Sequence, residues 1–391
     1  MSLNTTQIQL KSQAARSVYE IASAMGVTFG PYTEPCLTSF IPLVGFKYSM
    51  EVRSTTSQAL APIFSSACEN AVTGEARARS LPQQVFAPIV KSILQEIATA
   101  GTENDSDDIM DDLVAMADAL SEILFAAYHH KADNKWCIAV LSPNDADEVT
   151  VKVIQLLQNT FMERQGFWSN DDNDEKMHIE ACLSMSAQLI ASLVDCIGYI
   201  LKSNGVKFLK TFKDRIAPFL GPKLIRSTGG NDKAAQHAAI CLFDDCVEYC
   251  GPDAAAEYGK MLVPGIVEVL TTQRNSEDSD ELVAAAVYGV SQLARHAPAN
   301  LLVSVIGIVP SLLEIAACYQ VDSDNALSEG AISALASLLL FPSAPFKTFH
   351  TNVDSAKVLD VFLNAMPLRA DETEAQVKIL PTQLSESRLR R

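Results

Sequence analysis

The sequence predicts an all-α protein, a right-handed α-α superhelix of about seven helical hairpins that stack one on the next. Three observations predict this fold class. Prolines recur at a fixed spacing within apolar segments, acidic turns precede the first helix of most repeats, and apolar residues repeat at helical spacing. No convincing strand pattern occurs in the 391 residues.

Prolines mark the repeat. Pro42 and Pro88 are 46 residues apart, and the same spacing separates Pro218 from Pro264 and Pro264 from Pro310. Met366-Pro367 is a sixth case. The longer gap from Pro88 to Pro218 fits two lengthened repeats, with a helix at 151–161 in the missing position. A period of about 40–47 residues with two helices per unit is typical of HEAT and armadillo repeats.

Polar turns and glycines predict the helix boundaries. Runs of Asp, Asn and Ser precede the first helix of most units, and these residues cap helix N-termini, where backbone N–H groups lack partners. First helices are expected to end near a glycine or proline. The acidic turns are at 104–108, 231–232, 276–280 and 322–325, and the expected ends are at Gly26, Gly205, Gly251 and Pro298.

Together these signals predict a HEAT-repeat array over residues 1–376 and a divergent tail at 377–391. A small-residue stripe in 281–295 includes Gly289 and Leu293. One hairpin cannot bury such a stripe alone, so neighbouring hairpins must stack. Leu293→Ala is therefore expected to cost about 2–5 kcal/mol. The approximate units are 5–48, 49–101, 102–168, 177–227, 231–273, 279–320 and 324–376.

Charge and cysteine usage restrict the partners and the compartment. The net charge of -17 and the pI near 4.8 would repel a phosphate polyanion, so no nucleic-acid partner is expected and a basic protein is favoured. Nine cysteines without a C-x-x-C pair indicate a reducing compartment. The apolar stretch Leu301–Cys318 contains Pro310 and Glu314, which predicts a core helix and no membrane insertion.

No motif predicts catalysis, a metal or a cofactor, so an enzyme is not expected. His237, Cys241, Cys246 and Cys250 share one predicted helix, but the last two lie opposite the first two, so buried structural cysteines are favoured over a metal site. Asp244 and Asp245 also diverge by about 100°. Capping or hydrogen bonding between repeats is therefore favoured for them over a catalytic carboxylate pair.

Acidic residues remain as candidates for partner binding. Runs at 103–112 and 171–175 are either solvated turns or a docking surface for basic partners. An exposed ion pair contributes only about 0–1 kcal/mol, whereas micromolar affinity needs about 8 kcal/mol. A credible site therefore needs several carboxylates on the concave face together with apolar contact. The candidate residues are Glu96, Asp105, Asp107, Asp108, Glu148, Glu163, Asp171, Asp172, Asp174, Asp214, Glu257 and Glu268.

One stretch of sequence carries a family resemblance. The segment 240–250, ICLFDDCVEYC, resembles the importin-beta superfamily, in particular the importin beta-3 type of karyopherin. The segments 284–290 and 330–334 are similar to family helices, and Val52-Arg53 fits the HEAT pattern. The resemblance covers roughly residues 5–376.

This resemblance implies a nuclear transport receptor, acting in the cytoplasm, the nucleus and the nuclear envelope or pore. Its second helices would bind basic cargo proteins that carry nuclear localisation signals, and its first helices would contact Phe-Gly nucleoporins. Family members are longer, so the chain is expected to correspond to their C-terminal part. Ran GTPase is a partner by resemblance only, since the main contact region has no counterpart here. A static HEAT scaffold for a cytosolic complex is the alternative.

Overall fold

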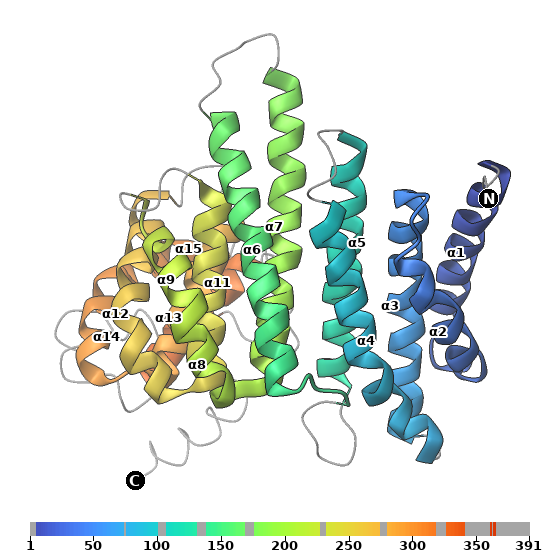
Figure 1. Ribbon diagram of the computed structural model, residues 1–391. Coiled ribbons are helices and arrows are strands. Elements are labelled where there is room, and N and C mark those ends of the chain that lie inside the picture. The colour runs from blue at the N-terminus through green and yellow to red at the C-terminus, as the bar shows by residue number, and fades with distance from the viewer. Residues whose placement is uncertain are drawn as a thin grey trace. The chain divides into compact units, whose positions relative to one another are not determined.

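Figure 1 shows the computed structural model, in which helices follow one another along the chain. The described residues contain no β-strand. They divide into two compact units, Met1–Lys207 and Phe208–Arg391. The structure describes residues 5–73, 76–100, 107–130, 138–168, 176–226, 232–273, 280–317 and 326–340, together with 360, 361, 363 and 364.

The first unit consists of two layers of helices (Figure 1). In each layer a helix contacts the next helix of the same layer. The first-helix layer contains α1 (Thr5–Met25), α3 (Met50–Thr73), α5 (Asp107–His129) and α7 (Lys176–Asn204). The second-helix layer contains α2 (Gly30–Val44), α4 (Ala76–Ala100) and α6 (Pro143–Trp168), and the 3-10 turn η1 (Gly26–Phe29) joins α1 to α2.

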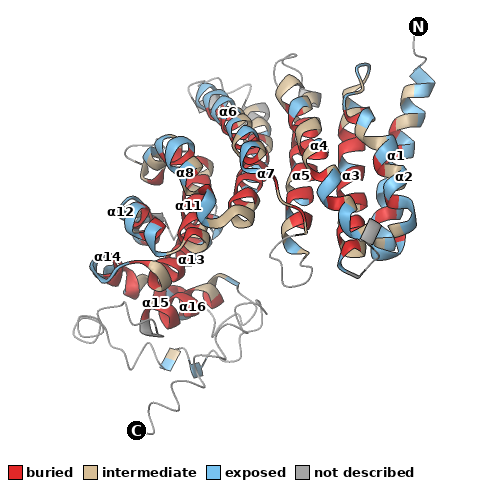
Figure 2. Ribbon diagram, turned by 60° about the horizontal axis from the view of Figure 1, so that its bottom comes forward, coloured by how far each residue is buried: buried red, intermediate tan, exposed pale blue. Residues whose placement is uncertain are grey.

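The core of the first unit lies between these layers and between successive first helices. Figure 2 shows buried residues on the sides of α3, α5 and α7 that face neighbouring helices. Phe64 of α3 stacks on Phe86 of α4 with ring centroids 5.5 Å apart. Hydroxyl groups also link successive first helices: Ser12 donates to Glu51 at 2.9 Å, Ser54 donates to Asp112, and Ser192 donates to Asp118.

The second unit continues the alternation of first and second helices. In it α11 contacts α13 and α13 contacts α16, while α12 packs on α11, α13 and α14. Phe212, Phe243 and Tyr258 form a buried aromatic cluster, with ring centroids 5.0–5.8 Å apart. The elements are η3 (Gly205–Phe208), α8 (Leu209–Thr211), η4 (Phe212–Ile216), α9 (Ala217–Leu220), η5 (Gly221–Leu224), α11 (Lys233–Cys250), α12 (Pro252–Glu268), η6 (Val269–Gln273), α13 (Asp280–His296), α14 (Ala299–Val305), η8 (Ile306–Ile308), α15 (Val309–Ala317) and α16 (Ala326–Leu340).

The predicted ends of the first helices are confirmed. α1, α7 and α11 each end immediately before a glycine with a positive φ, namely Gly26 (φ 50°), Gly205 (φ 54°) and Gly251 (φ 75°). Glycine adopts this backbone conformation without the steric cost that a Cβ would add. Pro298 directly precedes α14 with an extended backbone. These residues turn the chain from a first helix into a second helix.

Two of the predicted acidic turns act at helix N-termini. The Asp232 side chain accepts a hydrogen bond from the backbone N–H of Ala234 at 3.1 Å, capping α11. α13 begins with Asp280 and Glu281 in its first turn, where the helix dipole favours negative charge.

The five repeated prolines in the described part of the chain lie in second helices, where they take two different positions, and the sixth, Pro367, lies outside that part. Pro42, Pro88 and Pro264 lie inside α2, α4 and α12. Pro218 and Pro310 occupy the first turns of α9 and α15, directly after the π-helical η4 and the 3-10 helical η8. Because proline lacks an N–H and clashes with the carbonyl four residues earlier, a change of helical geometry before it relieves the clash.

The apolar stripes are largely buried as predicted. In α13, Leu282, Ala286 and Leu293 are at most 3% exposed, whereas Ala285 is only half-buried. Two helical segments, Ile179–Leu224 and Ala299–Ala317, are long and apolar enough to cross a membrane by length and composition alone, a test that core helices also pass.

The all-α solenoid fold is confirmed for the described residues. The unit boundaries and the count of about seven hairpins stay predictions. Most of residues 341–376, the tail at 377–391 and the turn at 322–325 lie outside the described part of the chain.

Candidate functional site

The candidate acids whose side chains the structure describes lie on second helices. In the first unit, Glu96 is on α4, and Glu148 and Glu163 are on α6. In the second unit, Asp214 is in η4, and Glu257 and Glu268 are on α12. Each set is a separate group of carboxylates within its own unit.

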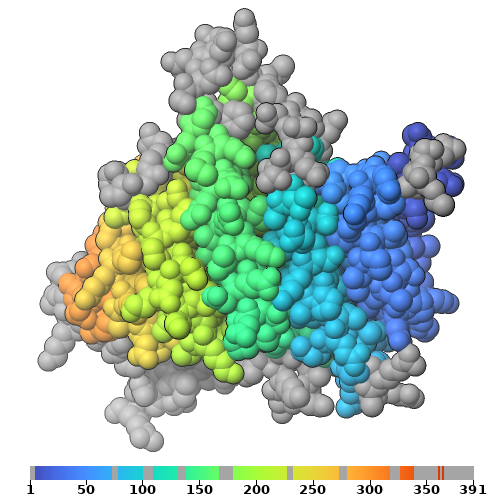
Figure 3. Space-filling view, in the orientation of Figure 1, coloured from blue at the N-terminus to red at the C-terminus, as the bar shows by residue number. Residues whose placement is uncertain are grey.

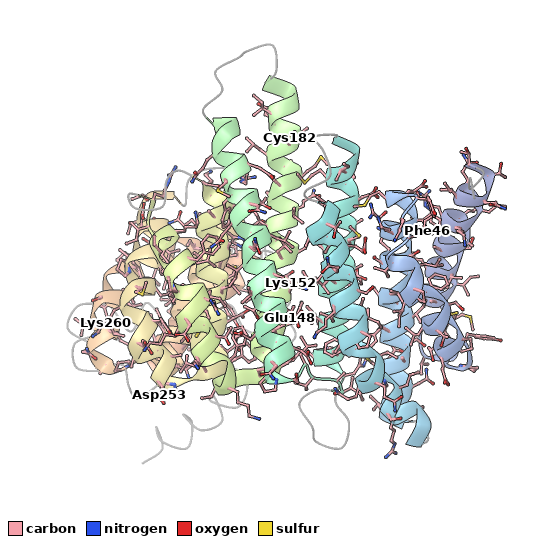
Figure 4. All side chains as sticks on the ribbon, in the orientation of Figure 1. Phe46, Glu148, Lys152, Cys182, Asp253 and Lys260 are labelled. Atoms are coloured by element: carbon pink, nitrogen blue, oxygen red, sulfur yellow. The ribbon has the colours of Figure 1, made fainter. Side chains whose placement is uncertain are left out.

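Glu148 belongs to a network of ion pairs between adjacent second helices. Lys91 of α4 lies 2.6 Å from an Asp145 oxygen and 2.8 Å from a Glu148 oxygen, so one ammonium group joins α4 to α6. Lys152, one turn along α6, pairs with the other Glu148 oxygen at 3.3 Å. Figure 4 labels Glu148 and Lys152 on α6, and Figure 3 shows α4 and α6 as adjoining surfaces.

These bases stabilise the carboxylate form of Glu148. Hydrogen bonds from Lys91 and then Lys152 lower the pKa of Glu148, and hydrogen bonds from Lys91 and Ser142 lower the pKa of Asp145. Both carboxylates are therefore charged at neutral pH. Because exposed pairs contribute only about 0–1 kcal/mol, a partner's lysine or arginine can replace Lys91 at little cost.

Glu96, unlike Glu148, is mostly buried in an ion pair within one hairpin. Arg53 of α3 lies 3.1 Å from a Glu96 oxygen, and the two side chains are only 12% and 17% exposed. This pair ties the two helices of one hairpin together. Glu163, in contrast, is exposed and borders a cavity of about 40 Å³ that also touches Ile97 and Leu189. Glu163 is thus more accessible to a partner than Glu96.

The second unit also pairs its acids with local groups. Lys213 of η4 lies 2.9 Å from Glu257 of α12, and this hydrogen bond raises the pKa of Lys213. Glu268 accepts a hydrogen bond from the backbone N–H of Arg226 at 3.1 Å. Asp214 is exposed beside Lys213 in the same segment. These three candidate acids therefore already have local partners or neighbouring bases, which an incoming basic partner would have to displace.

The acidic turns are described only in small part. Asp107 and Asp108 lie in the first turn of α5, and nothing is described of their side chains. Asp105, Asp171, Asp172 and Asp174 lie outside the described residues. A docking role for these six residues stays a prediction.

The cysteines of α11 take part in two separate contacts. Cys241 Sγ lies 3.4 Å from His237 Nε2, while Cys246 is hydrogen-bonded to Cys250, one turn further along the helix. Cys250 and burial raise the pKa of Cys246, so this thiol stays protonated. Among the described residues, no group of three or more potential metal ligands occurs.

Asp244 differs from the expectation. Its side chain is 1% exposed, and neither carboxyl oxygen has a hydrogen-bond partner within the described structure. The predicted hydrogen bond between repeats is therefore wrong for this residue. Burial, and then the charges of Asp245 and Glu248, raise its pKa well above the usual range. Burial of Asp244 therefore favours its neutral, protonated form.

The fold brings together two acids that were not among the candidates predicted from the sequence. Glu69 of α3 and Glu122 of α5 are 53 positions apart in the sequence, yet both line one groove on the first unit. No motif marks either residue, since only the lateral packing of α3 against α5 puts them side by side.

Comparison with solved structures identifies the fold. Kap121p, a karyopherin, superposes with a TM-score of 0.68 and 16% identity over 95% of this chain and 30% of its own. The chain has the HEAT-repeat fold of a karyopherin. Kap121p bound to Nup53p matches with a TM-score of 0.68 at 16% identity, and the complex with the SUMO protease Ulp1p matches with a TM-score of 0.67 at 15% identity.

The structural match tests the family resemblance that the sequence suggested. It confirms the resemblance to an importin-beta superfamily solenoid at the level of fold, over nearly all of this chain. The karyopherin-like chain spans about 30% of the length of the structures it matches. No family model matches the sequence.

Proposed function

We propose that this chain acts as a nuclear transport receptor of the karyopherin type, or as a portion of one, and that it binds protein cargo and Phe-Gly nucleoporins during protein import into the nucleus. The observation that carries this proposal is the fold match over 95% of the chain to Kap121p. Kap121p has been solved in complex with Nup53p, Ste12p, Pho4p and Ulp1p. Such a receptor is not an enzyme and moves between the cytoplasm and the nucleus.

Within this proposal, second-helix acids contact basic import signals. Glu148 and Glu163 are the best candidates in the first unit, because both are exposed on α6. Their contribution is electrostatic, so it weakens as salt screens the charges. Since single exposed pairs contribute about 0–1 kcal/mol, cargo affinity depends on several such acids acting together with apolar contacts.

A pull-down tests the proposal. The whole chain is incubated with immobilised Phe-Gly repeats and, separately, with a basic import-signal peptide, at low and at physiological salt. Both are expected to retain it, and the signal peptide should do so more weakly as salt increases. Retention by neither ligand at either salt would overturn the proposal. Stable binding of another protein without any affinity for Phe-Gly repeats would favour the static scaffold.

A pair of variants tests which acids take part. Glu148→Lys combined with Glu163→Lys should weaken signal-peptide binding and leave Phe-Gly binding unchanged. The matched control is Glu20→Lys combined with Glu281→Lys, which changes the net charge equally on exposed positions of the first helices α1 and α13. Equal loss in both variants would mean that net charge, and not the second-helix surface, governs binding.

A further inference from the structure

A groove of about 340 Å³ lies on the first unit, where α1, η1, α3 and α5 meet. Its volume is at the lower end of the range of ligand pockets, about 300–1,000 Å³. The floor consists of small side chains, including Ala22 and Ala61, which are at most 2% exposed. The groove therefore has a floor of small alanine and serine side chains and is open at the surface.

The groove faces away from the second helices. Phe64 of α3 points toward α4, where it stacks on Phe86. At about 100° per residue, Pro62, Ser66 and Glu69 lie about 140–200° around α3 from Phe64. These three residues line the groove. This surface thus belongs to the first-helix layer, on the opposite side of the hairpins from Glu148 and Glu163.

One wall of the groove is aromatic. Phe125 of α5 lines it and keeps 41% of its surface exposed. Its ring stacks on His129 with centroids 4.9 Å apart and packs against Tyr199 at 5.5 Å. These contacts fix the ring plane, so Phe125 is a preorganised surface for stacking.

Two carboxylates line the same groove. Glu69 and Glu122 form no ion pair and no hydrogen bond with any residue in the described part of the chain. Burial and the neighbouring Asp118 raise the pKa of Glu122, which means that its charge lacks compensation. His130 is close to Glu69, but burial lowers the pKa of this imidazole, so it is neutral at physiological pH.

We infer that this groove binds an arginine-bearing segment of a basic partner protein, with the arginine stem over Ala22 and Ala61 and the guanidinium between Phe125 and the carboxylates of Glu69 and Glu122. Charge complementarity selects a cation. The flat guanidinium stacks on an aromatic ring and bonds to carboxylates through two N–H groups, whereas an ammonium group does neither as well. The aliphatic stem suits the alanine floor.

The inference goes beyond the proposed function, because it concerns a second surface with its own ligand chemistry. Import signals in the proposed function contact second-helix acids, and Glu69 and Glu122 are on first helices. Loss of one activity therefore leaves the other measurable.

Fluorescence anisotropy with the whole chain tests the inference at physiological ionic strength, about 0.15 M. The probes are three labelled octapeptides in which serine alternates with arginine, lysine or citrulline. The arginine peptide should bind best, the lysine peptide several-fold more weakly, and the uncharged citrulline peptide weakest of all. Equal binding of the arginine and citrulline peptides would overturn the inference.

Variants locate the binding on the groove. Glu69→Gln with Glu122→Gln should weaken the arginine peptide by about tenfold or more, which corresponds to loss of two charge-assisted contacts. The matched control, Asp253→Asn with Glu281→Gln, removes the same charge from exposed positions of α12 and α13 and should change affinity less than about twofold. Similar losses in both variants would mean non-specific attraction to an acidic protein.

Two further measurements keep the test decisive. Phe125→Leu should abolish the preference for arginine over lysine, and circular dichroism must show that each variant stays folded. Sedimentation of the free chain shows whether a second copy covers the groove. A dimer that the Glu69/Glu122 variant dissociates, or displacement of the arginine peptide by a Phe-Gly peptide, would overturn the inference.

Discussion

Asp244 shows how a single residue can depart from the rule that buried polar groups are paired. Its carboxyl group is enclosed by α11 and α13, and no hydrogen bond to it forms within the described residues. Burying a charge in such a place is very costly, so the group takes up a proton instead. Asp112, at the corresponding kind of contact between α3 and α5, accepts a hydrogen bond from Ser54.

This environment makes stability depend on pH with a defined sign. The folded pKa of Asp244 is raised, so between the unfolded pKa, about 3.9, and that raised value the folded state binds more protons than the unfolded state. Asp244 therefore lowers stability by about 1.4 kcal/mol for each pH unit across this window. Asp244→Asn should remove this contribution.

Urea unfolding of the wild type and of Asp244→Asn from pH 5 to pH 8 measures the effect. Relative to the wild type, the variant should gain stability as the pH rises. Parallel pH profiles would show that Asp244 is ionised in the folded protein.

The candidate acids on second helices also have local partners that the sequence did not predict. Sequence reasoning selected Glu96, Glu148 and Glu257 as candidates for partner binding, and the structure places all three on second helices. It did not predict their partners Arg53, Lys91 and Lys213, because those bases come from other helices. Whether the acids bind cargo stays a prediction.

At the scale of elements, close packing of helices decides the role of Gly289. This residue is in the middle of α13, where glycine normally costs about 1 kcal/mol relative to alanine. A Cβ added here would lie 2.4 Å from an Asp244 oxygen and 2.7 Å from the Ile266 side chain. α13 therefore packs so closely against α11 and α12 at this point that there is no room for a side chain larger than that of glycine.

Gly289→Ala is expected to destabilise the protein by about 1–3 kcal/mol, because overpacking outweighs the gain in helix propensity. Gly166→Ala in α6 is the control, since an added Cβ there meets nothing within 4 Å, and it should be neutral or slightly stabilising. Denaturant midpoints measure both. An equal or higher midpoint for Gly289→Ala would mean that α13 can move aside.

The repeated prolines show a second property of elements. Their spacing predicted the period of the repeat, and the structure places each of the five in a second helix. The spacing did not say whether the helix would bend around the proline or restart at it. Local geometry decides this, because the carbonyl four residues earlier must find another arrangement.

At the scale of the molecule, each hairpin contacts chiefly its sequence neighbours. In the second unit α13 contacts α11 and α16, and in the first unit α3 contacts α1 and α5. In such a solenoid, weakening the interface between two hairpins destabilises mainly those two hairpins, because each hairpin is stabilised only by contacts with its immediate neighbours.

Leu293→Ala tests this locality. Leu293 is 0% exposed and one of its methyl groups lies 3.3 Å from where a Cβ on Gly259 would be, so truncation should cost about 2–5 kcal/mol. Hydrogen exchange should accelerate in α11, α13 and α16 and stay unchanged in α1 and α3. Val303→Ala, at a 50% exposed position, is the control. Uniform acceleration along the chain would contradict nearest-neighbour coupling.

Much of the fold could be predicted because its determinants are local. Gly26, Gly205 and Gly251 each follow the end of a helix, because glycine adopts a positive φ at low cost whatever its tertiary surroundings. The candidate site could be predicted only in part. Glu69, Glu122 and Phe125 carry no local pattern, and they meet because α3 packs beside α5.

The sequence by itself determined the helical hairpins, their turns and the apolar faces, because backbone preferences and hydrophobic periodicity act within a few residues. Tertiary structure alone decided the protonation of Asp244, the ion-pair partners of the second-helix acids and the groove at Phe125. Each of these depends on which side chains from distant segments share one space, and on how much water the packing leaves between them.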